Sequence, residues 1–336
     1  RQNITANTFS IGFHNKNTNE LNFANKVAET LETKHSYKYV NNKDCIENIQ
    51  SVVNAYDEPF SDPSQIPTYM LCKFVKNKIT VAISGEGADE LFGGYPRYKN
   101  IASFWNKIKK QPKVFSELME AFSESFSSSK YSYVRSIGKK FRKYSHTNLD
   151  SLYNDEMSRW RPDEKIMIER SFRGSYFEKK LTRLNNIVSD PRYLMMRDII
   201  TYLPSNLLVK TDRASMYNSL EIRSPYLDND LVSLVWSLPD NFILYKNEKI
   251  ILKEILKEKL GSNFVNRKKQ GFEPPLYDWL KGRLNQWAKD LLLKDNNFFD
   301  TSDIKKLILR FEKGEKKLTY KIWTIIMFMA WQNKFF

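Results

Sequence analysis

The chain has few of the residues that usually build disulfide frameworks and zinc sites. It contains two cysteines and three histidines among 336 residues. Cys45 and Cys72 are too few for a disulfide framework or a cysteine metal cluster, and they suit a reducing compartment such as the cytoplasm. His14, His35 and His146 are widely separated, which argues against a histidine zinc site.

Long apolar runs are also missing. No run reaches the ~18 residues that a membrane-spanning helix needs. The nearest candidate, Ile322 to Trp331, is too short, and its two tryptophans stand at helical spacing, so it predicts a buried C-terminal helix. The start of the sequence has no pattern typical of a signal peptide. Apolar residues still make up 41% of the chain, enough for one large core or two smaller ones.

Acidic residues are outnumbered, and the net charge is +15. The basic residues are spread along the chain, and the densest excess lies in residues 101–147, with ten Lys/Arg against three Asp/Glu. That spacing suits the solvent-facing sides of helices, so we favour a solvated surface over nucleic-acid binding. An anionic partner (RNA, a membrane surface or an acidic protein) is the alternative.

The most informative segment, Ser84–Tyr98, combines four glycines with three acidic residues. It follows the apolar run Ile79–Ile83, which predicts a buried parallel strand that opens into a loop. Ligands of open α/β sheets bind at the carboxyl ends of the strands. The glycines allow a close approach of the backbone, and Glu86, Asp89 and Glu90 suggest a magnesium ion beside a phosphate. A solvated acidic turn is the simpler interpretation.

The pattern of elements changes after about residue 100. Strands are predicted at 8–13, 35–40 and 79–84, helices at 20–33, 43–55 and 68–76, and a loop at 57–67. Strands separated by helices of this length imply parallel crossovers and a doubly wound sheet. From residue 101 to 336 we predict helices and no strand. We therefore expect an α/β part at 1–100 and a helical part at 101–336 of the same domain.

Several further segments occur in an order typical of one family. They are Thr8–Phe13, Tyr56–Phe60, Pro67–Tyr69, Leu203–Met216, Leu220–Asp228, Arg267–Phe272 and the helix that holds Trp323 and Trp331. With the Ser84–Tyr98 loop, they make the chain resemble the synthetase half of the glutamine-hydrolysing asparagine synthetases. The resemblance implies an ATP-pyrophosphatase fold, an adenine-nucleotide α-hydrolase-like doubly wound parallel sheet followed by a mostly α-helical C-terminal part.

The resemblance also implies ATP-dependent amide formation in two steps. A carboxylate, that of aspartate in the named enzymes, attacks the α-phosphorus of ATP and gives an acyl-adenylate and pyrophosphate; ammonia then displaces AMP. The implied cofactors are ATP and Mg2+, and the implied partner is an upstream glutaminase domain that supplies ammonia. Relatives with the same core close β-lactams, cyclise peptides or amidate surface-polysaccharide sugar acids, so the acceptor carboxylate stays open, as does a homodimer.

Binding roles follow from the resemblance for four residues. Ile11, Ser84 and Gly85 would line the adenine and ribose pocket, and Asp89 would hold magnesium on the pyrophosphate. Two ion pairs, Arg223–Glu221 and Asp212–Arg213, are expected to be buried and to fix the helical part against the sheet. A direct substrate role for Lys210 or Asp212 is left open.

Catalytic roles follow in the same way for Glu86 and Lys269. Glu86 would shape the acyl-adenylate site and take a proton from the attacking amine, and Lys269 would neutralise charge on the phosphates. Attack on phosphorus spreads negative charge over several oxygens, so a lysine and magnesium should dominate catalysis. A positioned carboxylate base adds about 10²–10⁴ in rate. Without the resemblance, Lys269 would be interpreted as a surface lysine.

The family's pyrophosphate-binding Ser-Gly-Gly-x-Asp-Ser loop and its glutaminase are missing from this sequence. In the family that the chain resembles, this loop and the strand before it precede the segment that matches Thr8–Phe13. The resemblance places that missing strand in the middle of the sheet, between the strands at 8–13 and 79–84. Because unpaired buried backbone groups cost about 1–3 kcal/mol each, we expect the natural protein to be longer. The alternatives are a non-catalytic remnant that binds nucleotide or a partner, and an RNA-modifying ATP pyrophosphatase.

Overall fold

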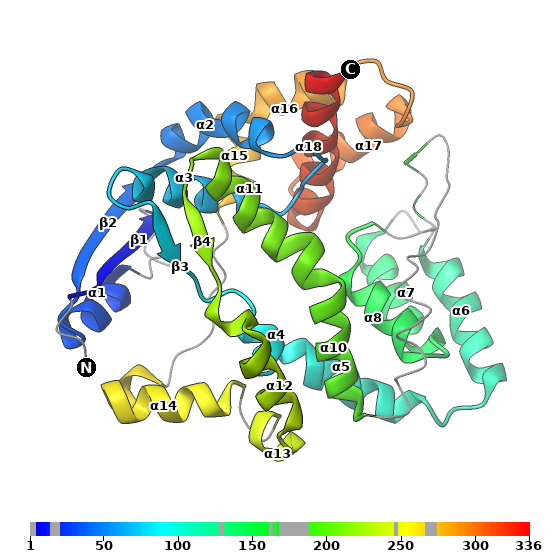
Figure 1. Cartoon of the computed structure of the whole chain (residues 1–336). Helices are drawn as coiled ribbons and strands as arrows, with labels where there is room; N and C mark the ends of the chain where they lie inside the picture. The colour runs from blue at the N-terminus through cyan, green and yellow to red at the C-terminus, as the bar shows by residue number, and fades with distance from the viewer. Residues whose placement is uncertain are drawn as a thin grey trace.

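A computed structural model of the chain describes residues 5–13, 21–127, 131–160, 164, 166–167, 188–244, 248–265 and 274–336. The described part is mostly helical, with short strands near one end of the molecule (Figure 1). The first elements are β1 (Asn7–Phe13), α1 (Leu21–Thr30), β2 (Lys34–Val40), α2 (Asn42–Ala55), α3 (Gln65–Lys76), β3 (Val81–Ile83), α4 (Ala88–Leu91) and α5 (Pro96–Ile108). The middle elements are α6 (Lys113–Ser127), α7 (Ser132–Ser145), α8 (Leu149–Met157), α10 (Asp190–Ile200), the π-helical turn η2 (Leu203–Leu208), α11 (Val209–Tyr217) and β4 (Glu221–Arg223). The last are α12 (Asn229–Ser237), α13 (Asp240–Ile243), α14 (Ile250–Leu260), α15 (Leu276–Lys281), α16 (Asn285–Leu292), α17 (Thr301–Glu312) and α18 (Thr319–Phe335).

The described strands form two parallel pairs rather than one sheet. β1 pairs with β2 from Asn7–Lys34 to Phe13–Val40, and β3 pairs with β4 from Val81–Glu221 to Ile83–Arg223. The predicted parallel arrangement is therefore confirmed within each pair. β4 corrects the prediction that no strand follows residue 101: three residues are too few to show a strand period, and this strand depends on pairing with a distant segment.

Two local predictions also need correction. β3 was expected to be buried, yet Val81 and Ile83 are 41% and 76% exposed, because β3 has a paired neighbour on one edge within the described residues. Helix α3 begins at Gln65 and not at Thr68, so the predicted loop at 57–67 is shorter. Pro67 lies in the first turn of α3, where proline is tolerated because its missing N–H has no helical partner anyway.

Two hydrophobic cores support the fold. The first joins the β1–β2 pair with α2, α3 and the C-terminal helices α15 to α18. The second joins α4, α5, α8, α10, α12 and α13. Ala82 and Ile222 of the β3–β4 pair pack against the first core, whereas Leu91, Phe92 and Tyr98 belong to the second. The glycine-rich segment 84–98 therefore connects the two cores.

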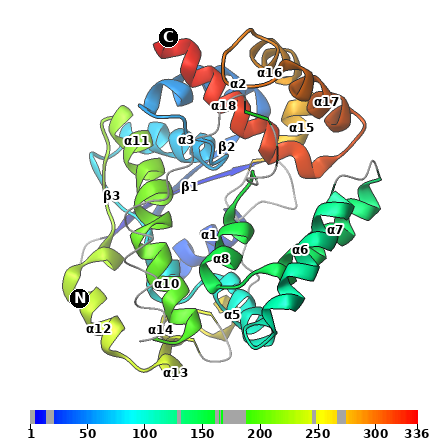
Figure 2. The ribbon, with the colours of Figure 1, turned by 90° about the vertical axis from the view of Figure 1, so that its right-hand side faces the viewer.

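The C-terminal helix is buried, as predicted. α18 crosses the first core beside α2 and α16 (Figures 1 and 2), and Trp323 is fully buried. At the far end of the helix, the Trp331 indole N–H donates to the Asp57 carbonyl oxygen at 2.9 Å. This hydrogen bond ties the end of the chain to the segment that follows α2.

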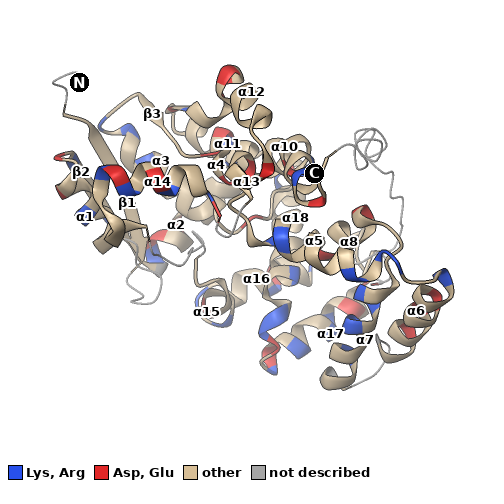
Figure 3. Ribbon diagram, turned by 90° about the horizontal axis from the view of Figure 1, so that it is seen from below, with Lys and Arg blue, Asp and Glu red and all other residues tan. Residues whose placement is uncertain are grey.

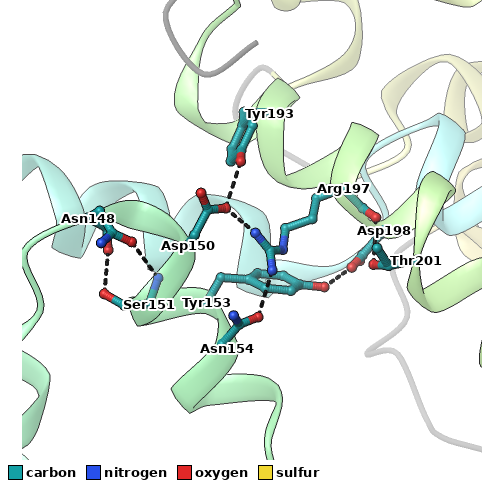
Figure 4. Close-up of polar contacts among 9 residues, drawn as sticks. All are labelled: Asn148, Asp150, Ser151, Tyr153, Asn154, Tyr193, Arg197, Asp198 and Thr201. Carbon is teal, nitrogen blue, oxygen red and sulfur yellow. Dashed lines mark hydrogen bonds and ion pairs between the residues drawn. The ribbon is translucent and has the colours of Figure 1, made fainter. Parts of the chain in front are cut away.

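A buried polar network joins α5, α8 and α10, and Figure 4 shows its contacts between α8 and α10. Asp198 of α10 is fully buried and accepts hydrogen bonds from side chains of the other two helices. The donors are Arg97 and Tyr98 of α5 and Tyr153 of α8. Arg197, which is also buried, pairs with Asp150 of α8. Buried charges are tolerated when they are paired and hydrogen-bonded, so this network fixes the three helices behind the 84–98 segment.

The basic region 101–147 covers α6 and α7, which pack as a hairpin at one side of the molecule (Figure 2). Several of its basic side chains pair with acids on other elements: Lys109 with Asp190, Arg135 with Glu315, Arg142 with Asp155 and Lys143 with Glu156. Figure 3 shows positive and negative positions dispersed over the ribbon. Within the described residues, no helix is long and apolar enough to span a membrane.

Candidate active site

The candidate site begins where β3 and β4 end side by side. The Ser84 N–H donates to the Arg223 carbonyl oxygen at 2.9 Å, which continues the ladder one residue beyond β3. The hydroxyl oxygens of Ser84 and Ser224 lie 3.2 Å apart. Because the strands are parallel, both carboxyl ends open at the same edge, the place where open α/β sheets bind ligands.

Gly87 makes the tight turn into α4. Its φ is +89°, a left-handed conformation that other residues adopt at a cost, and a Cβ at this position would overlap the Leu227 side chain. Gly85 is exposed, and a Cβ there would meet nothing within 4 Å. Gly87 is thus required by the turn, while Gly85 leaves open space beside the backbone.

Glu86 is held by the helix that follows the π-helical turn. The Thr211 hydroxyl of α11 donates to Glu86 Oε1 at 2.9 Å. Thr211 is buried and Glu86 is half-buried, so one carboxylate oxygen is fixed from inside the molecule. A carboxylate oriented in this way is suited to accept a proton or to bind a cationic group.

Asp89 lies beside a lysine from a distant segment. Lys249 Nζ is 3.1 Å from Asp89 Oδ1, and both side chains are partly buried. A Cβ at Gly94 would overlap the Asp89 carboxylate and the carbon stem of Lys249. Because Gly94 has no side chain, this ion pair can pack directly against the backbone of the 84–98 segment.

Glu90 points into the second core. It is 1% exposed and accepts a hydrogen bond from the Tyr95 hydroxyl at 2.8 Å. Burial raises the pKa of the Glu90 carboxyl above its ordinary value, although the Tyr95 hydrogen bond opposes the shift. The Arg97 guanidinium stacks on the Tyr95 ring at 3.7 Å and bonds to Asp198, which connects Glu90 to the buried polar network.

The acids of the segment thus have three different partners. The described residues contain no group of three or more His, Cys, Asp or Glu side chains placed to hold a metal ion. Magnesium keeps several waters and is usually bound by one or two carboxylates together with substrate phosphates. Asp89 could supply one such carboxylate to a magnesium ion that is bound together with a phosphate.

The six predicted site residues lie in three separate places along the chain. Ser84, Gly85, Glu86 and Asp89 lie on one segment at the end of β3. Ile11 lies in β1, in the other strand pair, with its side chain buried in the first core. Lys269 lies outside the described residues. The roles given to these six residues stay predictions.

Two residues of the site were not assigned from the sequence. Thr211 lies in the Leu203–Met216 segment that carries the resemblance, but nothing in the sequence indicates that its hydroxyl reaches Glu86. Lys249 lies in a lysine-rich run, and its neighbours do not distinguish it. Both were missed because their partners lie more than a hundred residues away, a relationship that local patterns cannot show.

The two predicted ion pairs exist, but their predicted burial is wrong. Arg223 Nε lies 2.7 Å from Glu221 Oε1 and both side chains are exposed, since residues two positions apart in a strand lie on the same face, here the exposed face of β4. Arg213 pairs with Asp212 at 2.8 Å, and it also pairs at 2.8 Å with Asp57. These contacts lie at the surface, where ion pairs contribute little to stability.

Comparisons with known proteins agree on one family. A family model described as asparagine synthase matches residues 1–333. Asparagine synthetase [glutamine-hydrolyzing] 1 of Bacillus subtilis is 27% identical over 340 residues, which cover 97% of this chain and 52% of that protein. A putative asparagine synthetase [glutamine-hydrolyzing] of Mycobacterium bovis is 27% identical over 343 residues, covering 100% of this chain and 52% of that protein.

A relative with a different name matches part of the chain. Amidase chyE of Penicillium rubens is 25% identical over 248 residues, which cover 65% of this chain and 35% of that protein. The chain spans about half the length of the Bacillus subtilis and Mycobacterium bovis relatives.

Proposed function

The chain belongs to the asparagine synthase family, and from that premise we propose that it is the ATP-using part of an enzyme that forms an amide bond through an acyl-adenylate. The proposed reaction converts a carboxylate, ATP and ammonia to an amide, AMP and pyrophosphate. Aspartate is the first acceptor to test, because the asparagine synthetases among the relatives are named for its amide.

The arrangement of Glu86 and Asp89 carries this proposal. Both lie at the carboxyl end of the β3–β4 pair, one oriented by Thr211 and the other beside Lys249. Adenylation followed by amine attack requires two parts. One is a carboxylate that accepts a proton, and the other is an acid–lysine pair that contacts phosphate.

The candidate site residues have separate roles in the proposed mechanism. Ile11, Ser84 and Gly85 bind adenine and ribose, and Gly85 leaves room for the nucleotide beside the backbone. Asp89 would hold magnesium, which would supply positive charge to the pyrophosphate. The ammonium groups of Lys249 and Lys269 add further charge.

Proton transfer is assigned to Glu86. When ammonia attacks the acyl-adenylate, its nitrogen becomes positively charged and must lose a proton. The Glu86 carboxylate accepts that proton with its free oxygen, while the other oxygen stays bonded to the Thr211 hydroxyl. Orientation by Thr211 keeps the accepting oxygen in one place during the step.

The wider setting of the enzyme is also proposed. Residues 1–100 and 101–336 would form the α/β and helical parts of one synthetase domain, with the strand pairs as parts of a doubly wound ATP-pyrophosphatase sheet. A glutaminase domain would supply ammonia, and the enzyme would act in the cytoplasm. These proposals rest on membership of the family. The chain itself covers about half the length of the Bacillus subtilis relative.

An acceptor other than aspartate is the second candidate. The match to Amidase chyE places a differently named protein among the relatives. Another carboxylate, such as a surface-polysaccharide sugar acid, would use the same adenylation chemistry.

The test uses the protein as it occurs in its cells. It is supplied with MgATP, an ammonium salt and a panel of carboxylates, and AMP, pyrophosphate and amide are measured. AMP, pyrophosphate and amide formed with L-aspartate would support the first candidate. The same products with another carboxylate alone would support the second. No AMP with any acceptor would favour a non-catalytic remnant.

A further inference from the structure

Helix α6 of the α6–α7 hairpin exposes its large apolar side chains to solvent. Val114, Leu118 and Phe122 are 67%, 49% and 42% exposed. They follow one another at a spacing of four residues, so they form one stripe of about 12 Å along the helix. Phe115 is also exposed and borders the same side of the helix. These four residues are called the α6 stripe below.

The packed side of α6 carries small polar residues instead. α6 packs against α7 (Figure 2), and the α6 residues Ser116 and Ser123 are buried. The Ser116 hydroxyl donates to the Lys113 carbonyl oxygen at 2.7 Å, so its burial does not depend on a distant partner. A hairpin surrounded by water normally buries leucine and phenylalanine and exposes serine. This inverted pattern indicates that the α6 stripe contacts a further surface.

Charge is distributed unevenly along α6. Basic residues lie at the start of the helix and acidic residues follow, in the order Lys109, Lys110, Lys113, Glu117, Glu120 and Glu124. The acidic residues would be repelled by an anionic lipid surface, so this distribution disfavours a membrane as the partner. A matching partner is acidic beside the start of α6 and basic beside its end.

A second copy of the same helix has that distribution when it runs in the opposite direction. In an antiparallel pair with a two-fold axis near Leu118, Val114 of one copy lies opposite Phe122 of the other. The basic start of each α6 then lies beside the acidic end of its partner, and the two helix dipoles oppose each other. A parallel pair would bring like charges together. A two-fold interface uses the same surface on both copies, and it is the commonest symmetry of homo-oligomers.

We propose that the chain forms a homodimer in which the α6 stripes of two copies pack antiparallel. The two α6–α7 hairpins then form a four-helix arrangement, in which apolar stripes of this kind are buried. Leu118 lies at the axis, and Lys113 lies beside Glu124 of the second copy. The hairpin and the β1–β2 pair lie at opposite sides of the molecule in Figure 1, and no residue of the candidate site belongs to the hairpin. The dimer therefore does not depend on the proposed function.

Sedimentation velocity of the full-length protein over a range of concentrations tests the dimer. We expect a reversible dimer, and Leu118→Glu should raise its Kd about 100-fold or more, because a carboxylate enters the interface twice. Leu309→Glu is the matched control: Leu309 of α17 is 56% exposed and lies outside the α6 stripe, so the Kd should not change. Circular dichroism verifies the fold of each variant. A protein that stays monomeric, or a dimer that Leu118→Glu leaves intact, would overturn the proposal.

Charge reversal tests the direction of the two helices. Lys113→Glu alone and Glu124→Lys alone should each raise the Kd about 3- to 10-fold, because each places like charges together twice. The double variant exchanges the two charges, so it should restore the Kd of the unaltered protein. A double variant that dimerises more weakly than either single one would contradict the antiparallel arrangement.

Cross-linking gives a second readout that does not depend on the measured affinity. Cys45 and Cys72 are buried, so a cysteine introduced by Leu118→Cys would be the accessible thiol among the described residues. Near a two-fold axis, it should form a disulfide with its copy under mild oxidation, whereas Leu309→Cys should not. Absence of the linked dimer would overturn the proposal, as would a monomer that binds phosphatidylcholine vesicles through Leu118. Amide formation by a monomeric protein would leave the proposed function standing and remove this inference.

Discussion

Lys249 forms an ion pair with Asp89 across the candidate site, with Nζ 3.1 Å from Oδ1. Its backbone supports the pairing: Lys249 has φ of +53°, in the left-handed region, and its N–H donates to the Phe92 carbonyl oxygen at 3.2 Å. A non-glycine residue in this conformation stores strain, which is common at ligand-binding positions. The positive charge of Lys249 thus lies at the carboxylate proposed to hold magnesium.

Replacing Lys249 with methionine should weaken the use of MgATP. The variant loses one positive charge beside the phosphate site, and we expect KM for MgATP to rise about 10- to 100-fold, as for loss of one charged hydrogen bond. Pyrophosphate release measured against MgATP concentration checks this. Lys253→Met, which removes a lysine one turn further along α14 that pairs with Glu248, is the control and should leave KM unchanged. An unchanged KM in Lys249→Met would show that this lysine does not meet the phosphates.

Replacing Gly87 with alanine should destabilise the fold. The left-handed backbone and the overlap with Leu227 together should cost about 2–5 kcal/mol in the free energy of unfolding. Urea unfolding followed by circular dichroism measures the loss. Gly85→Ala is the control, since an added Cβ there meets nothing within 4 Å, and it should change stability little. Equal stability of the two variants would contradict the described turn.

Replacing Glu86 with glutamine should lower kcat more than it changes binding. The amide cannot accept the proton that a carboxylate takes, and the expected loss is about 10²- to 10⁴-fold. Thr211→Val removes the hydroxyl that orients Glu86 and should cause a smaller loss in the same direction. Single-turnover amide formation, with circular dichroism to verify the fold, checks both variants. Normal turnover by Glu86→Gln would remove this residue from catalysis.

The cysteines should be unreactive in the folded protein. Both are buried and neither forms a disulfide. Burial, assisted for Cys45 by the Asp44 charge, raises the pKa of both the Cys45 and the Cys72 thiols to about 12. A raised pKa favours the protonated thiol, and the thiolate is the reactive form. A thiol reagent at pH 8 should therefore label neither cysteine until the protein is denatured, when both should react. Rapid labelling of the native protein would contradict this burial.

Local patterns in the sequence predicted the regular elements well. The strands near residues 8–13 and 35–40 and the helix between them have periods long enough to recognise, and Cys45 and Cys72 lie on helices as expected. β4 could not be predicted, because its three residues become a strand by pairing with β3. The same limit hid the exposure of Val81 and Ile83, since an apolar run suggests burial without showing what covers it.

The candidate site was predictable as a segment and not as a set of contacts. The glycines and acids of residues 84–98 identified the segment, and Gly87 and Gly94 have the close approaches that such glycines suggest. The partners that give each acid its place come from elsewhere in the chain: Thr211 for Glu86 and Lys249 for Asp89. Such contacts depend on how distant helices pack, which the sequence pattern does not contain.

The measurement that tests the central claim most directly follows oxygen from the acceptor to AMP. The protein as it occurs in its cells is given MgATP, ammonium and L-aspartate with ¹⁸O in its side-chain carboxylate, and the AMP is analysed by mass spectrometry. Adenylation of the carboxylate predicts that one labelled oxygen is transferred to the AMP phosphate. Formation of asparagine with unlabelled AMP, or with ADP and phosphate, would contradict the account.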